Sequence, residues 1–349
     1  MVKIFSSLNS RPEHVKDAAK AKIRNLKIVV LLCAMLLALS PLAEAQQQKI
    51  PRIGVIFPGG PLSQTIDGLR DGLKELGLEE GKQFNLTIRD TRGDAKAAAD
   101  AARTFEQEKV NLIYAIASSV IGAAKKATQN VPIVFSIGSD PVALGLVNDF
   151  AKPGERLTGV HYLVKDLTAK RLEILKEILP KISRVVAFFD PANPASPVPA
   201  EGAALAREEA KRLGLKFIER HVSSSEELRK GLQGLKVGEA DAFFYIPDAM
   251  VIGQAQLIID TAKAKKLPTM FHEQSLVAKG ALASYGQNYY ELGWLSAKYV
   301  QKVLSGTHPK DLKIETVENV ELAINLKTAK ELGLTIPPNV LARAKKVIK

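Results

Sequence analysis

The chain has 349 residues, of which 46% are apolar and 25% are charged, a globular composition that excludes a disordered, collagenous or coiled-coil chain. At about 100–200 residues per domain, this length suggests two domains. The single cysteine excludes an internal disulfide and a cysteine-based metal site. The formal net charge of +12 raises the question of a nucleic-acid or membrane partner.

The first 45 residues have the pattern of a secretory signal peptide. The uncharged apolar run 28–39 follows a basic segment and precedes the small-residue site Ala43-Glu44-Ala45. Its helical length of about 18 Å is less than the hydrocarbon core of about 30 Å. We therefore predict a signal peptide over residues 1–45, cleavage near Ala45 and a periplasmic location. A retained signal anchor is the alternative.

Removal of this leader lowers the net charge to +8, with 42 Lys and Arg against 34 Asp and Glu. The last 24 residues, 326–349, account for +5 of that charge. The sequence contains no N-terminal helix-turn-helix pattern, zinc-finger spacing or aromatic RNA-binding motif. These observations predict a solvated basic terminus and no nucleic-acid partner.

From residue 53 onward, short β-rich runs alternate with helical periodicity, which is typical of an α/β fold with parallel sheets covered on both faces. The predicted strands are 53–57, 84–88, 111–115, 131–136, 185–189, 217–222, 242–246, 268–271, 281–285 and 322–324. The predicted helices are 66–77, 94–107, 118–128, 166–179, 201–213, 225–235, 249–264, 289–304 and 326–332. The Gly- and Pro-rich segment 140–159 interrupts the alternation and separates two βα units of similar size.

Polar groups follow the predicted strands at the edge where open parallel sheets bind ligands. The strand ends read Pro58-Gly59-Gly60, Ala117-Ser118-Ser119, Gly138-Ser139-Asp140-Pro141, Asp190-Pro191-Ala192-Asn193, Pro247-Asp248 and Tyr285-Gly286-Gln287-Asn288. Helix N-termini at this edge favour a carboxylate, and Asp140, Asp190 and Asp248 suit an ammonium group. For each of these residues taken singly, ordinary turn and capping chemistry is the better explanation. Together they predict a site for a small zwitterionic or polar solute.

Catalytic motifs are missing from the sequence. It has no nucleophile elbow, zinc-protease helix, phosphate loop or dinucleotide fingerprint, and its histidines are scattered. We therefore predict no enzyme, no metal and no cofactor. The pair His272-Glu273 is interpreted as a surface turn and Trp294 as a core residue, whereas Tyr162, Tyr245 and Tyr285 are candidates to face a ligand.

Several blocks of the sequence together carry a family resemblance. They are PRIGVIFPGG (51–60), VPIVFSIGSDPVALGLVNDFAKPGERLTGV (131–160), FFDPANP (188–194), YIPDAM (245–250), ASYGQNYYELG (283–293) and LAINLKTAKELGLTIPPNVLARAKKVI (322–348). In this order they resemble the ABC-transporter substrate-binding proteins related to tryptophan- and tyrosine-binding lipoproteins, over nearly all of 51–348. The chain departs from that family in lacking a lipobox cysteine, which predicts a freely diffusing protein, and in the GERLT sequence at 154–158.

The resemblance implies a type I periplasmic-binding-protein fold, with two Rossmann-like lobes joined by three hinge crossings near 156–162, 285–290 and 317–322. Lobe 1 would comprise 51–158 plus 287–318, and lobe 2 would comprise 159–286 plus 319–349. The implied ligand-binding residues are Ser118, Ser119 and Asp140 from lobe 1, Asn193 and Asp248 from lobe 2, and Tyr285 and Asn288 at a crossing. Gly59, at the end of the first strand, completes the predicted set.

The predicted function is that of a monomeric extracytoplasmic solute-binding protein of an ABC importer. It would capture a small-molecule ligand, by likeness an aromatic or branched amino acid, in the interlobe cleft and deliver it to a membrane permease. The alternative is a periplasmic sensory or sugar-binding module of the same fold that feeds a receptor.

Overall fold

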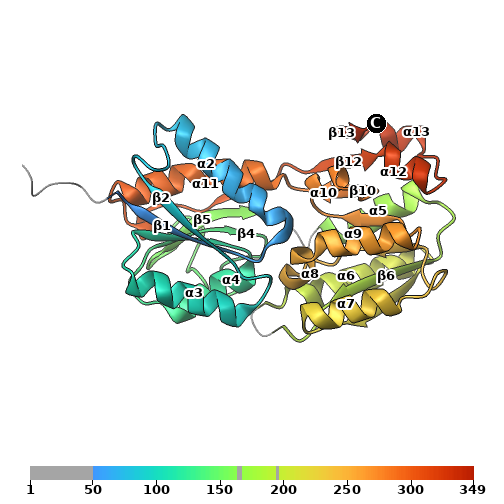
Figure 1. Cartoon of the computed structure of the whole chain (residues 1–349), viewed down its shortest axis with the longest axis horizontal. Helices are drawn as coiled ribbons and strands as arrows, with labels where there is room; N and C mark the ends of the chain where they lie inside the picture. Colours follow the sequence, from blue (N-terminus) through green and yellow to red (C-terminus); the bar gives the residue numbers. More distant parts are fainter. Residues whose placement is uncertain (1–49, 163–166, 194–195) are drawn as a thin grey trace, which may run out of the picture. The chain divides into compact units, whose positions relative to one another are not determined.

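Two β-sheets, each covered by helices, organise the chain (Figure 1). The computed structural model describes residues 50–162, 167–193 and 196–349, which belong to one unit. The predicted signal peptide and its cleavage site lie outside the described residues and stay a prediction.

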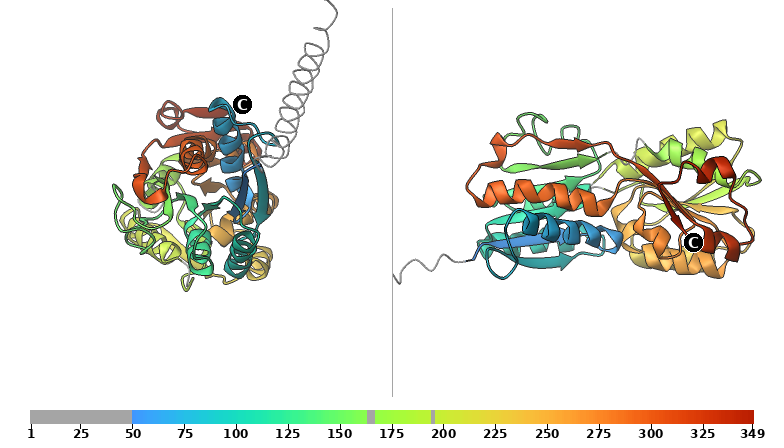
Figure 2. Two further views of the ribbon diagram at one scale, coloured as in Figure 1. Left: turned by 90° about the vertical axis from the view of Figure 1, so that its left-hand side faces the viewer. Right: turned by 90° about the horizontal axis from the view of Figure 1, so that it is seen from above.

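The first sheet contains six parallel strands in the order β11-β5-β4-β3-β1-β2. Its strands are β1 (Arg52–Phe57), β2 (Asn85–Asp90), β3 (Leu112–Ile116), β4 (Ile133–Ile137), β5 (Leu157–Tyr162) and β11 (Glu315–Val317). The accompanying helices are η1 (Gly60–Leu62), α2 (Ser63–Glu75), α3 (Ala95–Gln107), α4 (Ser118–Ala127), α11 (Tyr289–Leu304) and η3 (Pro309–Asp311). Helices α2 and α11 lie side by side over one face of the sheet, and α3 and α4 cover the other (Figures 1 and 2).

The second sheet contains seven strands in the order β13-β12-β10-β9-β8-β6-β7. They are β6 (Arg184–Phe189), β7 (Lys216–His221), β8 (Ala242–Phe244), β9 (Thr269–Phe271), β10 (Ala283–Gly286), β12 (Glu321–Asn325) and β13 (Lys346–Ile348). All pairs are parallel except β10 with β12. Its helices are α5 (Thr168–Ile178), α6 (Val198–Arg212), α7 (Ser225–Gly234), α8 (Ala249–Gly253), α9 (Ala255–Ala264), α10 (Ser275–Ala278), α12 (Leu326–Glu331) and α13 (Pro338–Leu341).

The two sheets share one strand order. Five strands of the first follow the order 2-1-3-4-5, and β7-β6-β8-β9-β10 repeat it in the second. The central strands β3 and β4 are buried along their whole length, as parallel strands covered on both faces must be. The order reverses between β1 and β3 and between β6 and β8, so each sheet has a switch point where ligands characteristically bind. The predicted α/β class with parallel sheets is confirmed; the lobe boundaries and hinge crossings stay predictions.

Some local predictions were wrong. The predicted helix 249–264 is two helices, α8 and α9, because Gln254 leaves the helical region at φ −105° and ψ 18°. Trp294 is 40% exposed, since α11 presents the neighbouring Gly293 to the backbone of α2. His272 and Glu273 are buried rather than on the surface.

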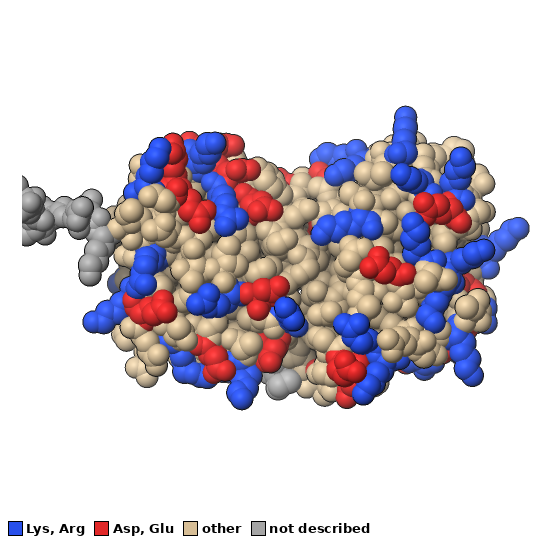
Figure 3. Space-filling model, in the orientation of Figure 1, with Lys and Arg blue, Asp and Glu red and all other residues tan. Residues whose placement is uncertain are grey.

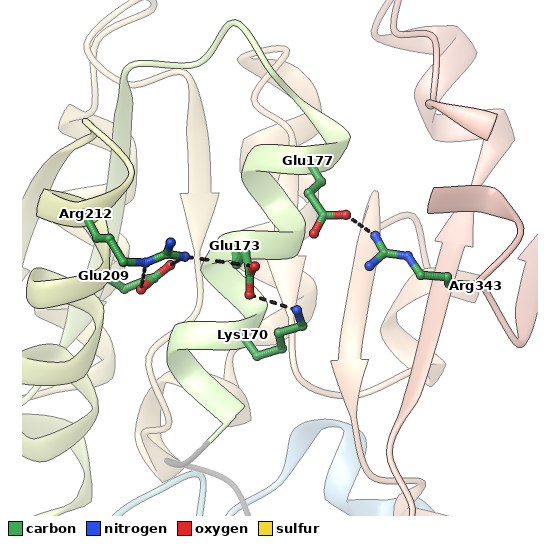
Figure 4. A network of polar contacts seen from close by, with 6 residues as sticks. All are labelled: Lys170, Glu173, Glu177, Glu209, Arg212 and Arg343. Atoms are coloured by element: carbon green, nitrogen blue, oxygen red, sulfur yellow. Dashed lines mark hydrogen bonds and ion pairs between the residues drawn. The ribbon is translucent and has the colours of Figure 1, made fainter. Parts of the chain in front are cut away.

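Ion pairs connect α5 to its two neighbours (Figure 4). On one side, Glu173 contacts Lys170 at 2.8 Å and Arg212 at 4.0 Å, and Arg212 also pairs with Glu209 at 2.6 Å. On the other side, Glu177 binds Arg343 of the C-terminal segment. Such surface pairs each contribute at most about 1 kcal/mol, so they help to seat the C-terminal segment without defining the fold.

The basic charge belongs mostly to the residues of the second sheet and its helices. The segments of the first sheet and its helices, 50–162 and 287–318, contain 17 Lys and Arg residues and 17 Asp and Glu residues. The segments of the second, 167–286 and 319–349, contain 23 Lys and Arg residues and 16 Asp and Glu residues. In the face shown in Figure 3, the Lys and Arg side chains are spread over the surface rather than gathered in one continuous patch. This distribution is consistent with the predicted solvated basic terminus.

Candidate functional site

A small cavity of about 60 Å³ lies where the carboxyl ends of strands from both sheets meet. Its walls include Ala117, Ser118 and Ser119 after β3 and Tyr245, Pro247 and Asp248 after β8, so both switch points contribute. At about 30 Å³ per water molecule, the cavity holds about two waters. Wider hollows flank it and share Ser118, Ser119, Asn193 and Ser196 with its walls.

The N-terminus of α4 forms one wall of the cavity. Ala117, at its N-cap, has φ 79° and ψ 145°, a strained conformation for a residue with a Cβ. No side chain of the described residues caps this helix, and the following residues Ser118 and Ser119 line the cavity. The Ser118 and Ser139 hydroxyls are 2.6 Å apart, which connects this turn to the end of β4. Free backbone N–H groups with a positive dipole end can hold an anion such as a carboxylate.

A second helix N-terminus faces the same cavity from the other sheet. Helix α6 begins at Val198, after Pro197, and Val198 and Pro199 line the cavity. The Val198 N–H donates to the Ser196 Oγ at 3.3 Å. The cavity therefore lies between the positive ends of two helix dipoles.

Four buried aromatic rings contribute to the wall of the cavity. The His272 ring stacks on Tyr245 with 4.5 Å between ring centroids, and its Nε2 lies within hydrogen-bonding distance of the Tyr289 hydroxyl. The Tyr289 ring in turn meets Tyr162 edge to face at 6.1 Å. All four residues are at least 97% buried. These contacts provide an apolar surface with fixed ring orientations for a flat or branched side chain.

Burial sets the charge of the polar groups around these rings. It lowers the pKa of His272 well below its usual value, helped by the nearby Arg171 charge, so His272 is neutral at physiological pH. Arg171, fully buried on α5, donates to the Thr168 Oγ1 at 2.9 Å, and burial lowers its pKa to about 10, which leaves it charged. Burial also raises the pKa of Asp248.

Asp248 organises the start of α8. Its Oδ1 accepts hydrogen bonds from the N–H groups of Met250 and Val251, at 2.8 and 3.0 Å, and its Oδ2 accepts from the Asp190 N–H at 2.9 Å. The Tyr245 hydroxyl accepts from the Asp248 N–H and donates to the Asp248 carbonyl. The carboxylate thus has a structural role as a helix cap, even though the residue lines the cavity.

Four of the eight predicted site residues meet at the cavity: Ser118, Ser119, Asn193 and Asp248. The other four have local roles. Asp140 is exposed and accepts from the N–H groups of its own turn, and Asn288 caps α11 in the same way. Tyr285 lies on β10 against the apolar core of the second sheet. Gly59 has φ 87° in the turn before η1, where a Cβ would lie 2.8 Å from an Asp90 oxygen.

The sequence reasoning missed several cavity residues. Ser139 belongs to a strand end named above, and Tyr289 adjoins the predicted Asn288, so the strand-end rule selects turns that border this cavity. His272 follows β9, and that position at a strand end was the signal that its surface interpretation overlooked. Among the described residues there is no group of His, Cys, Asp and Glu side chains suited to a metal ion.

Comparison with known proteins decides the family. The family described as "ABC transporter substrate binding protein" matches residues 52–348. The chain belongs to this family. The predicted resemblance is thereby confirmed, and the chain is a substrate-binding protein with the type I periplasmic-binding-protein fold.

Relatives within the family bind aromatic amino acids. A tyrosine-binding protein of Clostridioides difficile (strain R20291) is 27% identical over 292 residues, 83% of each chain. A solved ABC domain from Streptococcus pneumonia in complex with L-Trp is 25% identical, with a TM-score of 0.75. The ligand-free, open structure of a substrate-binding protein with adhesive properties from Clostridium difficile is 28% identical, with a TM-score of 0.56. Both structures cover 86% of this chain and are themselves covered completely.

Proposed function

We propose that this protein is the solute-binding component of an ABC importer and captures an apolar, aromatic or branched amino acid in the cavity between its two sheets. The family is extracytoplasmic. The signal-peptide pattern supports a periplasmic location, and within the described residues no helix is both long and apolar enough to span a bilayer. Delivery to a membrane permease belongs to the same proposal.

The observation that carries the proposal is the pairing of an anion-binding helix end with an aromatic wall. The backbone and hydroxyls at the start of α4 suit the ligand carboxylate, and α6 adds a second positive dipole end. Tyr162, Tyr245 and Tyr289 suit the ligand side chain. The ligand ammonium would find oxygen acceptors in Asn193 and Asp248, although Asp248 already accepts three backbone hydrogen bonds.

Hinge closure is the proposed capture step. A cavity of about 60 Å³ is smaller than the roughly 300 Å³ of the smallest typical ligand pockets, so we expect its walls to move apart when a ligand enters. The L-Trp complex and the open, ligand-free structure have comparable sequence identity to this chain and equal coverage, but the TM-score is higher for the L-Trp complex, 0.75 against 0.56. This difference supports a closed arrangement here. A ligand shifts the equilibrium between open and closed forms only through its higher affinity for one of them.

Calorimetry and thermal shift with a defined panel test the proposal. The panel contains L-tryptophan, L-tyrosine, L-phenylalanine and L-leucine, the amines tryptamine and tyramine, which lack the carboxylate, and myo-inositol. We expect micromolar binding, about −8 kcal/mol, for at least one amino acid and none for the amines. At a hundredfold excess over Kd, that ligand stabilises the protein by about 2.7 kcal/mol.

Substitutions locate the site within the chain. The variants Ser118→Ala and Ser119→Ala should each weaken amino-acid binding by about tenfold, because each removes a hydroxyl beside the carboxylate. The control is Ser305→Ala, an exposed serine at the C-terminal end of α11. Two results would contradict the proposal. One is a Kd in the millimolar range or weaker for every panel member, and the other is equally tight binding of the amines and the amino acids.

A further inference from the structure

Helix α8 approaches the loops after β1 and β2 closely enough for backbone to contact backbone. A Cβ added to Gly253, the last residue of α8, would lie 2.5 Å from the carbonyl oxygen of Pro58, after β1. A Cβ on Gly93, after β2, would lie 2.3 Å from the Cα of Met250 on α8. Real Cβ atoms essentially never lie within 3.0 Å of such atoms, and backbone cannot rotate away as a flexible side chain can. The present position of α8 therefore requires glycine at both places.

The same helix forms a wall of the cavity. Ala249 and Ile252 of α8 line it together with Asp248, which caps the helix. Leu62 of η1, which follows β1, also lines the cavity and belongs with Ile252 to one continuous cluster of buried apolar residues. Any displacement of α8 from the loops after β1 and β2 therefore widens the cavity.

We propose that Gly93 and Gly253 are positioning residues for ligand capture. Because these two glycines have no side chains, α8 can pack closely against the loops of the first sheet. This packing brings Ala249 and Ile252 into contact with the ligand. The inference rests on the proposed binding function and adds the contact that completes closure. This contact of α8 belongs to the closed arrangement. That arrangement is supported by the TM-scores, which are higher for the L-Trp complex than for the open structure.

The distances set the size of the expected effect. Ordinary van der Waals contact of a Cβ begins at 3.4 Å, so a methyl group at either position forces α8 and the facing loop about 1 Å apart. The lost contact lies between the two sheets, so the helices and strands within each are untouched. We therefore expect the variants to favour an open form and to release ligand at least tenfold faster.

Two matched pairs of variants test this inference. Gly253→Ala is compared with Gly234→Ala, at the end of α7, where the new Cβ has no described heavy atom within 4 Å. Gly93→Ala is compared with Gly77→Ala. The two glycines have nearly equal φ values, 80° and 82°, but the space around Gly77 is open among the described residues. Each pair therefore separates the effect of the steric contact from the effect that alanine has on the backbone itself.

The readouts are the dissociation rate of L-tryptophan and L-tyrosine by stopped flow and the radius of gyration of ligand-free protein by X-ray scattering. We expect Gly253→Ala and Gly93→Ala to release ligand faster and to have a larger radius of gyration than wild type. Both control variants should behave like wild type. If the wild-type protein binds neither amino acid, the proposed ligand class is wrong. The scattering comparison then still tests the contact of α8 with the first sheet. Equal radii and equal release rates within each pair would overturn the inference. If one variant does not fold, the other pair decides.

Discussion

Replacing Tyr245 by Phe removes one oxygen atom and leaves two backbone groups of Asp248 without their partner. The Tyr245 hydroxyl accepts from the Asp248 N–H at 2.8 Å and donates to the Asp248 carbonyl at 3.0 Å, and Tyr245 is only 2% exposed. Each buried polar group left unsatisfied costs about 1–3 kcal/mol. Because the start of α8 can partly relax, we expect Tyr245→Phe to lower the free energy of unfolding by about 2–3 kcal/mol. This is a factor of about 30 to 150 in the unfolding equilibrium.

Urea denaturation at pH 7 measures this loss. The matched control is Tyr290→Phe, since the Tyr290 hydroxyl donates to the Asp71 carboxylate at 2.8 Å but the residue is 38% exposed and water can replace it. The control should change the free energy of unfolding by less than about 0.5 kcal/mol. Equal losses in the two variants would refute the reasoning, because burial of the stranded groups would then not matter.

Three further changes have defined outcomes. Ala117→Gly relieves the backbone strain at φ 79° and should stabilise the protein by about 1 kcal/mol; a lower melting temperature would contradict this. His272 is kept neutral by burial, so the unfolded chain alone takes up its proton below pH 6.5; from pH 7 to pH 5, His272→Gln should lose up to about 2 kcal/mol less stability than wild type. Burial raises the pKa of Asp241, but hydrogen bonds from Arg184 and Ser183 outweigh it and lower the pKa to about 2. Stability from this carboxylate is therefore fully present above pH 3.8 and is lost as the pH falls through about 2. After allowance for solvent screening, Asp241→Asn should cost about 1 kcal/mol at pH 7 and much less at pH 2, as urea midpoints would show.

The fold was predictable wherever a strand is a continuous apolar run. Strands β1, β3, β4 and β6 are such runs, and their burial on both faces is what the pattern indicates. Strand β5 was missed because it carries Thr158 and His161 directly after a Gly- and Pro-rich segment. Strands β11 and β13 have three residues each, too few to show a period, and exist because a neighbouring strand offers its edge.

The candidate site was predictable to the level of its turns. The rule for strand ends selects Ser118 and Asp248, which line the cavity, but it also selects Asp140 and Asn288, whose side chains accept hydrogen bonds from the N–H groups of their own turns. Sequence alone cannot separate these cases, because the same short polar side chains serve both purposes. The contact between His272 and Tyr289 depends on how α11 packs after β10, which no local pattern contains.

The return of the chain to the first sheet has a consequence for its biogenesis. Helix α11 covers one face of that sheet and β11 completes its edge, yet both follow β10 of the second sheet in sequence. A nascent chain that has reached Gly286 contains β1 to β5 but not α11, so the part of the sheet face that α11 covers in the complete protein is still open to water. Neither sheet is complete before the last tenth of the sequence is reached, because β11, β12 and β13 all begin after residue 314. We expect such late completion to delay folding, which would suit the proposed export of the chain before it folds.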